Sequence, residues 1–149
     1  MTFDLIAPEQ IRAVWPRVKA GLERVLQVCT ETWIAEDIFA HLRTKLANLY
    51  VCHEGNTYLG FFIIEANKRD PFTNELFMNV WIVYAEPQNG GEHFADVARL
   101  VEDSIGFLDG LAQKAGIKVI RMSGRRGWER FLSGVFQPIR VCYERTLPT

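Results

Sequence analysis

The sequence predicts a mixed sheet of the α+β or mixed α/β class, with helices on both faces of the sheet. Apolar segments typical of strands alternate with segments of helical period in the order β-α-α-β-β-β-α-β-α-β. Hairpin connections lie in the middle of this order, and a crossover helix joins two later strands. Antiparallel hairpins together with a crossover helix indicate a mixed sheet.

Size and composition restrict the class of protein. The chain has 149 residues, 48% of them hydrophobic, so we expect one domain over residues 1–149 with a sizeable core. A formal net charge of −1 gives no overall attraction for nucleic acid. The three cysteines lack metal or redox spacing, the first sixteen residues do not resemble a targeting signal, and no apolar run is long enough for a membrane span. We therefore expect a cytoplasmic protein without a metal ion or a membrane partner.

The N-terminal third is predicted to hold one strand and two helices. Residues 3–7 are short and apolar, which is typical of a strand. A helical stripe follows from Pro8 to Leu26, and Pro16 within it predicts a kink or two short helices. Residues 33–46 form a second amphipathic segment, with acidic residues near its positive end.

A hairpin is predicted next. Residues 49–54 and 58–66 read as two strands joined by the turn signal Gly55-Asn56. Gly60 lies inside the second strand and indicates a bulge or a close backbone approach. Residues 67–74 are expected to form a surface loop.

The central feature of the chain is a strand, a glycine-containing turn and a long helix. Residues 76–84 are rich in β-branched and aromatic side chains and predict a strand buried on both faces. Residues 86–91 form the turn, and a helical period runs from Glu92 to Gly116, a left-handed cap. This arrangement directs backbone N–H groups at an anion.

The C-terminal part completes the predicted order. Residues 117–122 read as a strand, and residues 123–127 as a loop. A short helix covers residues 128–132 and ends near Gly134. Residues 138–147 alternate and predict a closing strand.

The element order is similar to that of the GNAT superfamily of acyl-CoA N-acyltransferases. Two segments carry the resemblance: the strand 80–84 with the turn 87–91 and the long helix, and the late segment 128–136. In that family the turn carries a basic residue or Gln, two spacers, Gly, one spacer, then Gly or Ala, and it holds the pyrophosphate of coenzyme A. The resemblance implies a GNAT-like central mixed sheet with a splay between strands 80–84 and 118–122.

The resemblance also implies an activity, the transfer of an acetyl group from acetyl-CoA to an unidentified amine. The acceptor would be a small molecule or a protein, attacked directly without a metal. Backbone amides near Val83 and Tyr84 would polarise the thioester carbonyl. The cofactor-binding residues implied by the alignment are Val83, Tyr84, Asn89, Gly90 and Gly91.

Candidate catalytic residues are less well defined. Glu65 and Glu75 lie at the end and the start of neighbouring central strands, so either could act as a base, although such carboxylates are more often solvated strand ends. The family's late-helix Tyr corresponds here to Phe131, which cannot donate a proton. Tyr143 could donate the proton instead, although a Tyr on a strand usually packs.

Departures from the family pattern favour a second hypothesis. The glycine turn is short, Glu92 stands where Gly or Ala is expected, and Phe131 replaces Tyr. A GNAT fold without catalytic activity could serve as a binding or virion-associated structural module of a bacteriophage, in the host cytoplasm or the virion. A splayed cleft would support the enzyme, whereas a cleft filled by Trp81, Phe94 or Trp128 would support this alternative.

A cluster of arginines supports a third hypothesis. Arg121, Arg125, Arg126 and Arg130 lie close together in the sequence and could bind the phosphates of a cofactor or of nucleic acid. No nucleic-acid-binding motif accompanies them, so we favour a solvated basic edge that pairs with acidic helices. The aromatic content would also suit a homodimer.

Overall fold

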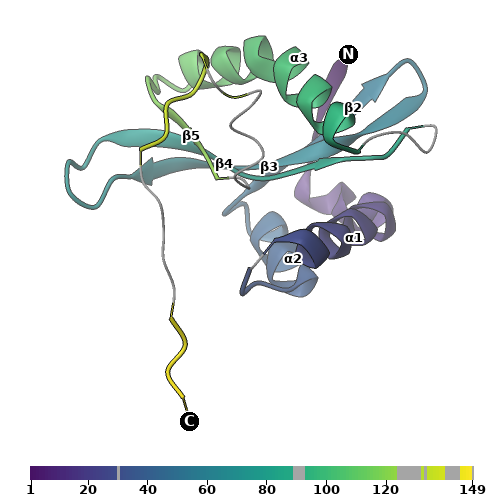
Figure 1. Cartoon of the computed structure of the whole chain (residues 1–149). Coiled ribbons are helices and arrows are strands. Elements are labelled where there is room, and N and C mark those ends of the chain that lie inside the picture. Colours follow the sequence, from purple (N-terminus) through teal and green to yellow (C-terminus); the bar gives the residue numbers. More distant parts are fainter. Residues whose placement is uncertain (30, 89–92, 124–131, 133, 140–144, 149) are drawn as a thin grey trace.

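A five-stranded mixed sheet forms the centre of the protein. The computed structural model describes residues 1–29, 31–88, 93–123, 132, 134–139 and 145–148 (Figure 1). The strands β1 to β5 lie side by side in chain order, with the bounds Thr2–Ile6, Asn48–Glu54, Thr57–Arg69, Leu76–Ala85 and Ile120–Met122. Strands β1 to β4 pair antiparallel, whereas β5 pairs parallel with β4. The predicted mixed sheet is therefore confirmed.

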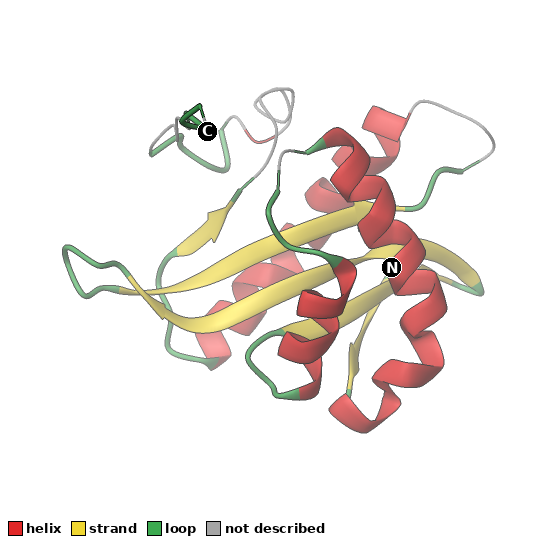
Figure 2. Cartoon of the chain, turned by 90° about the horizontal axis from the view of Figure 1, so that it is seen from below, coloured by secondary structure: helices red, strands yellow, loops and turns green. Residues whose placement is uncertain are grey.

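Helices cover both faces of this sheet, as the sequence predicted. After the 3₁₀ helix η1 (Pro8–Gln10), helices α1 (Ile11–Val28) and α2 (Ala35–Arg43) pack on one face. Helix α3 (His93–Lys114) packs on the other face and leads to β5 (Figures 1 and 2). No helix among the described residues is long and apolar enough to cross a membrane.

The two N-terminal helices differ from their predicted bounds. Helix α1 is not divided at Pro16, because this residue lies in the second turn and the apolar stripe beyond it, with Val18 and Leu22, is buried against the sheet. Helix α2 is shorter than residues 33–46. The Asp37 carboxylate accepts a hydrogen bond of 3.0 Å from the Ile34 N–H, which fixes the start of the helix.

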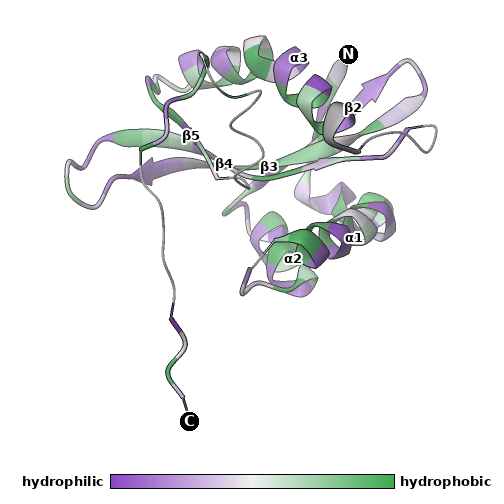
Figure 3. Cartoon of the chain, viewed as in Figure 1, coloured by the Kyte–Doolittle hydropathy of each residue, from purple (hydrophilic) through white to green (hydrophobic). Residues whose placement is uncertain are grey.

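Each face of the sheet has its own hydrophobic core. On the α3 face, side chains of the two central strands pack against side chains of the helix. The strands contribute Phe62, Ile64, Met78, Val80 and Val83, and α3 contributes Leu100, Val101 and Leu108. On the other face, the core under α1 and α2 contains Ile11, Val18, Leu22, Ile38, Phe61, Ile63, Ile82 and Tyr84. Apolar residues accordingly lie along the central strands (Figure 3). The prediction that residues 76–84 are buried on both faces is confirmed.

Strand β4 contains a one-residue bulge at Trp81. Ile63 pairs with Ile82 and the next residue, Ile64, pairs with Val80, so Trp81 is left without a partner on β3. The bulge reverses which side chains face α3. Before it, Met78 and Val80 face α3 (even positions), and after it Val83 and Ala85 do so (odd positions). Tyr84 is thereby directed toward α1.

Strand β3 contains a second bulge, beside Gly60. Cys52 pairs with Gly60 and His53 with Tyr58, so Leu59 is the extra residue. Gly60 has φ = +143°, and a Cβ atom at this position would lie 2.0 Å from the carbonyl oxygen of Tyr84. Only glycine fits this backbone conformation and this contact. The sequence prediction of a bulge or a close approach is confirmed in both respects.

Two boundaries around β3 and β5 correct the sequence prediction. Strand β3 continues to Arg69, so the predicted loop 67–74 starts later, because Lys68 and Arg69 still pair with β4 beyond a kink at Asn67, where φ = +61°. Strand β5 covers three residues instead of 117–122. Ile117 packs in the α3 core after the left-handed residue Gly116, which confirms the predicted cap.

The predicted late elements fall largely outside the described residues. Leu132 is helical, but residues 124–131 are not described. Of the predicted closing strand 138–147, residues 138–139 and 145–147 are not in a strand, and residues 140–144 are not described. Proline lacks an N–H group, so Pro138 cannot donate a ladder hydrogen bond at the start of this segment.

The turn between β3 and β4 is fixed by Asp70. Its Oδ1 accepts hydrogen bonds from the N–H groups of Phe72 (2.8 Å) and Thr73 (3.0 Å), and its Oδ2 lies 2.9 Å from Nη2 of Arg121 on β5. The Arg121 guanidinium also stacks over the Phe77 ring at 4.3 Å. These donors lower the pKa of Asp70 to about 2. Arg121 therefore pairs with a carboxylate, but its partner lies in the β3–β4 turn and not in an acidic helix as we expected. The other arginines of the cluster, Arg125, Arg126 and Arg130, lie outside the described residues.

Replacement of Asp70 should change the response to acid. Because the folded pKa is depressed, the stabilisation is complete above the ordinary pKa of 3.8 and is lost as the pH falls toward about 2. We expect Asp70→Asn to lower the free energy of unfolding at neutral pH. The difference in this free energy between the variant and the wild type should shrink between about pH 5 and pH 2. Urea unfolding of both proteins across this pH range measures the difference. A constant difference, or the same behaviour in the exposed control Asp109→Asn, would contradict this interpretation.

Replacement of Gly60 should be among the most damaging changes in the sheet. Gly60→Ala forces a Cβ atom onto the Tyr84 carbonyl, so we expect a loss of about 3 kcal/mol or more in the free energy of unfolding. Gly55→Ala is the control, because Gly55 also has positive φ but a Cβ atom there has open space. Its expected cost is about 1 kcal/mol. Equal costs in chemical denaturation would show that the contact with Tyr84 is unimportant.

Candidate functional site

Within the part of the chain that the structure describes, β5 pairs with only part of β4. The ladder between β4 and β5 joins Met78 to Ile120, Asn79 to Arg121 and Val80 to Met122. Strand β4 continues to Ala85, paired with β3 alone among the described residues. Among the described residues, the pairing of β4 with β5 ends at Val80, directly before the bulge at Trp81. The predicted splay between these strands stays a prediction, because residues 124–131, which follow β5, are not described.

The direction of the backbone N–H groups along this open edge follows from two hydrogen bonds. The Met78 N–H donates to the Val119 carbonyl on the β5 side (2.9 Å), whereas the Glu86 N–H donates to the Leu59 carbonyl on the β3 side (2.9 Å). N–H groups alternate along a strand, so the Tyr84 N–H points to β3 like that of Glu86. The N–H groups of Val83 and Ala85 consequently point to the open edge.

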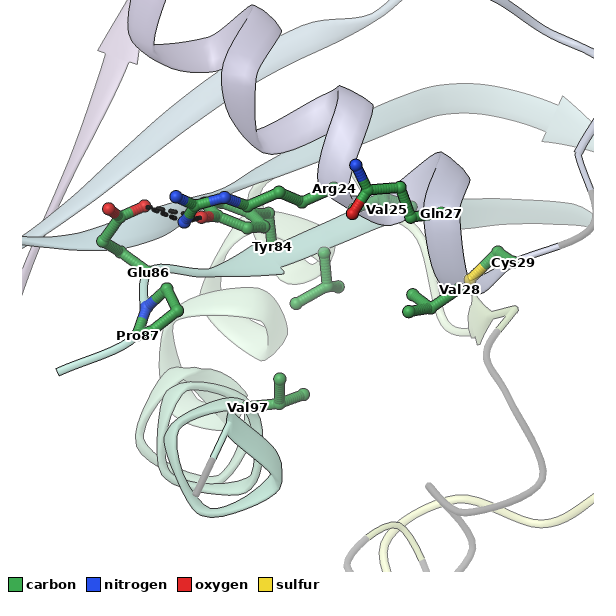
Figure 4. Close-up of a pocket in the computed structure, with 10 residues that line it drawn as sticks. Arg24, Val25, Gln27, Val28, Cys29, Tyr84, Glu86, Pro87 and Val97 are labelled. Carbon is green, nitrogen blue, oxygen red and sulfur yellow. Dashed lines mark hydrogen bonds and ion pairs between the residues drawn. The ribbon is translucent and has the colours of Figure 1, made fainter. Parts of the chain in front are cut away.

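A pocket of about 420 Å³ lies beside this edge. It is lined by the last turn of α1, the end of β4 and one residue of α3, namely Arg24, Val25, Gln27, Val28, Cys29, Val83, Tyr84, Glu86, Pro87 and Val97 (Figure 4). Helices α1 and α3 belong to opposite faces of the sheet. One pocket reaches both helices because the described part of β5 does not extend along this section of β4.

Three polar side chains meet in the pocket. The Tyr84 hydroxyl accepts a hydrogen bond from Nη1 of Arg24 (2.7 Å) and donates one to Oε2 of Glu86 (2.6 Å), and Figure 4 shows them pointing toward one another. The Arg24 Nη1 and Glu86 Oε2 atoms are 3.7 Å apart. Burial and the bond to Glu86 raise the pKa of Tyr84 to about 12, so the phenol stays protonated at neutral pH.

Gly21 allows α1 to position this group. A Cβ atom on Gly21 would lie 2.7 Å from ring atoms of both Phe61 and Tyr84, so the helix backbone rests directly on these rings. Arg24 is one turn further along the same helix face, which places its guanidinium at the Tyr84 hydroxyl.

The entrance to the glycine turn is held by Gln88. Its side-chain Nε2 donates to the carbonyls of Tyr58 (3.2 Å) and Glu86 (2.9 Å), and its N–H donates to Oδ2 of Asp96 in the first turn of α3 (3.2 Å). These bonds fix the end of β4 relative to the start of α3. The turn itself, with the predicted residues Asn89, Gly90 and Gly91, lies outside the described residues, as does Glu92.

The other sequence candidates lie elsewhere. Glu65 is 8% exposed, accepts a hydrogen bond from Asn79 (2.9 Å) and pairs with Lys68 (3.1 Å). Glu75 directly precedes β4, at the end opposite the pocket. Tyr143 is not described. The structure thus brings Val83 and Tyr84 together in the pocket but neither carboxylate with them.

Sequence reasoning missed Arg24, Cys29 and Glu86. Arg24 lies on the polar side of a helix and Glu86 begins a turn, so neither position is unusual locally. The available signal was Gly21, a glycine within a helical stripe three residues before Arg24. Trp81, expected as a plug in the alternative hypothesis, does not line the pocket. Its ring contacts His41 of α2 at 5.3 Å between centroids.

Solved structures share this architecture. No family model matches the sequence, and no curated protein matches it either. A predicted acetyltransferase from Clostridium acetobutylicum, solved with acetyl-CoA, has 15% identity and a TM-score of 0.66, with 97% of this chain and 95% of that chain covered. A probable acetyltransferase has 14% identity, a TM-score of 0.63 and coverages of 100% and 98%. The chain has the GNAT fold.

An aminoglycoside acetyltransferase from an uncultured soil metagenomic sample, solved with trehalose, has the same fold. Its identity to this chain is 10%, its TM-score is 0.63, and the alignment covers 99% of this chain and 96% of that chain. The GNAT fold is therefore shared with proteins whose identity to this chain is only 10–15%. The GNAT-like fold inferred from the sequence is confirmed.

The packing of α1 on Tyr84 can be tested at Gly21. Alanine normally stabilises a helix relative to glycine by about 1 kcal/mol, but at Gly21 its Cβ atom would press on two rings. We expect Gly21→Ala to lower the free energy of unfolding by about 1–3 kcal/mol. The matched control is Gly106→Ala in α3, where a Cβ atom has open space and stability should rise by up to about 1 kcal/mol. Two changes of the same sign in urea unfolding would exclude the close contact.

Proposed function

We propose that residues 1–149 form one GNAT-fold domain that transfers an acetyl group from acetyl-CoA to a primary amine. The observation that carries this proposal is the edge of β4 that no described strand covers after Val80, because the Val83 N–H points to this edge and Val83 lines the pocket beside it. A fixed N–H group in such a place can stabilise negative charge on a carbonyl oxygen.

The residues present fit acetyl-CoA. The N–H groups of Val83 and Ala85 can bind the amide groups of an extended pantetheine arm as a neighbouring strand would. The start of α3 and the turn with Asn89, Gly90 and Gly91 would hold the pyrophosphate, as the family resemblance implies. The Clostridium acetobutylicum protein of the same fold, solved with acetyl-CoA, supports this assignment.

The protein's own groups would act at three points. Acetyl-CoA supplies the activated acetyl group as a thioester. The Val83 N–H would stabilise the charge that develops on the thioester oxygen, and one such donor typically contributes about 100- to 1,000-fold in rate. Glu86 lies in the pocket and can accept a proton from the attacking amine. Tyr143 stays our candidate for the proton donor to the leaving thiolate.

Acetyl-CoA binding tests the proposal directly. We expect micromolar affinity by isothermal titration, and at about 100 times the dissociation constant the fold should gain about 2.7 kcal/mol in stability. Gly91→Glu should weaken binding at least about tenfold, because it places a carboxylate beside the pyrophosphate. Gly106→Glu adds the same charge to the exposed middle of α3 and should have no effect. Absence of both heat and thermal shift at millimolar acetyl-CoA would refute the proposal.

A further inference from the structure

The charged groups in the pocket retain unused hydrogen-bonding capacity. A guanidinium has five N–H donors, and Nη1 of Arg24 gives one to Tyr84, whereas Nε and Nη2 donate to no described residue. Glu86 accepts from Tyr84 through Oε2, and its Oε1 accepts from no described residue. The two side chains are 54% and 37% exposed, so a ligand can reach both.

Tyr84 bridges the two charged groups, which also form an ion pair. Its hydroxyl lies between Arg24 and Glu86 with short hydrogen bonds to each, while the direct distance between the charged groups is 3.7 Å. A bidentate pair would use both carboxylate oxygens and two guanidinium N–H groups on each other. Here the phenol occupies one position on each partner, and Nε and Nη2 of Arg24 and Oε1 of Glu86 have no hydrogen-bond partner among the described residues. The pocket therefore presents a cation and an anion side by side.

The ligand that complements such a pair carries an anion beside a cation. An α-amino acid has its carboxylate and its ammonium group on one carbon atom. The rest of the pocket wall is mainly apolar, with Val25, Val28, Val83, Pro87 and Val97. These side chains would accept an apolar substituent on that carbon. At about 420 Å³ the pocket can hold the acetyl end of the cofactor together with one small acceptor.

We propose that the acceptor is a free α-amino acid with an apolar side chain. Its carboxylate binds Arg24, its ammonium group binds Glu86, and Tyr84 positions these two residues. The acetylation of the amino group rests on the proposed function, whereas the binding of the amino acid does not.

The atoms and protons of the proposed acetyl transfer are balanced as follows. The amine nitrogen forms a bond to the acetyl carbon, and the carbon–sulfur bond of the thioester breaks. The ammonium group gives up two protons in all. One passes to Glu86 and on to solvent, and the other ends on the thiol of free coenzyme A. The products are an N-acetyl amino acid and coenzyme A, and no further reactant is required.

Other amines complement the pocket less well. A polycation such as an aminoglycoside, the substrate class named for one protein of this fold, would meet the positive charge of Arg24. The amino-terminus of a protein lacks a carboxylate on its first residue, which would leave Arg24 without an anionic partner. These acceptors are the alternatives that the experiment separates.

Binding without cofactor is the first test. Isothermal titration with L-leucine and with L-leucinamide compares two ligands that differ only in the carboxylate, and we expect leucinamide to bind at least about tenfold more weakly. Arg24→Met should lower the affinity for leucine about 10- to 100-fold and leave that for leucinamide unchanged. Arg12→Met, a change of the same kind on an exposed part of α1, should change neither. Equal binding of both ligands, or no binding of leucine at millimolar concentration, overturns the proposal.

Thiol release from acetyl-CoA separates this inference from the proposed function. With L-leucine we expect turnover, and Glu86→Gln should lower kcat/KM about 100-fold. Turnover with simple amines or aminoglycosides but not with amino acids would support the proposed acetyltransferase activity and refute the amino-acid acceptor. Leucine binding that depends on Arg24 in a protein that does not bind acetyl-CoA would support the amino-acid site and refute the acetyltransferase.

Discussion

The site depends on a single extra residue in β4. If Trp81 were paired normally, the alternation set by Met78 and Val80 would continue, and Tyr84 would face α3 instead of α1. Its hydroxyl could not then reach Arg24. The Val83 N–H would point to β3 and close the ladder, so the open edge would offer no donor there. One bulge therefore sets the hydrogen-bond edge, the side-chain direction and the pocket together.

Tyr84 is held in this orientation by the absence of two side chains. Gly60 on β3 lies against its carbonyl oxygen, and Gly21 on α1 lies against its ring. Glycine within a helix costs about 1 kcal/mol relative to alanine. At Gly21 the fold accepts this cost, because a larger residue would lift α1 and move Arg24 away from the phenol.

Much of the fold was predictable because it depends on local chemistry. Gly60 and Gly116 carry conformations that other residues avoid, and residues 76–84 are apolar enough for burial on both faces. The bulge at Trp81 was not predictable, because a strand that is apolar on both faces has no alternation whose reversal could be seen in the sequence. Helix α2 and strands β2, β3 and β4 lie between Arg24 and Glu86 in the sequence. The two residues come together only in the folded chain.

Two arginine–carboxylate pairs in this protein show what separates a structural pair from a binding pair. Asp70 receives two backbone N–H groups and Arg121, and its side chain is 7% exposed, so it has little left to offer a ligand. The pair formed by Arg24 and Glu86 is exposed to solvent and bridged by a phenol, and some of its donors and one acceptor have no partner among the described residues. The lowered pKa of Asp70 reflects how completely it is bonded. In this protein, donors and acceptors without a described partner indicate a ligand site better than a shifted pKa does. They lie in the pocket at the end of β4.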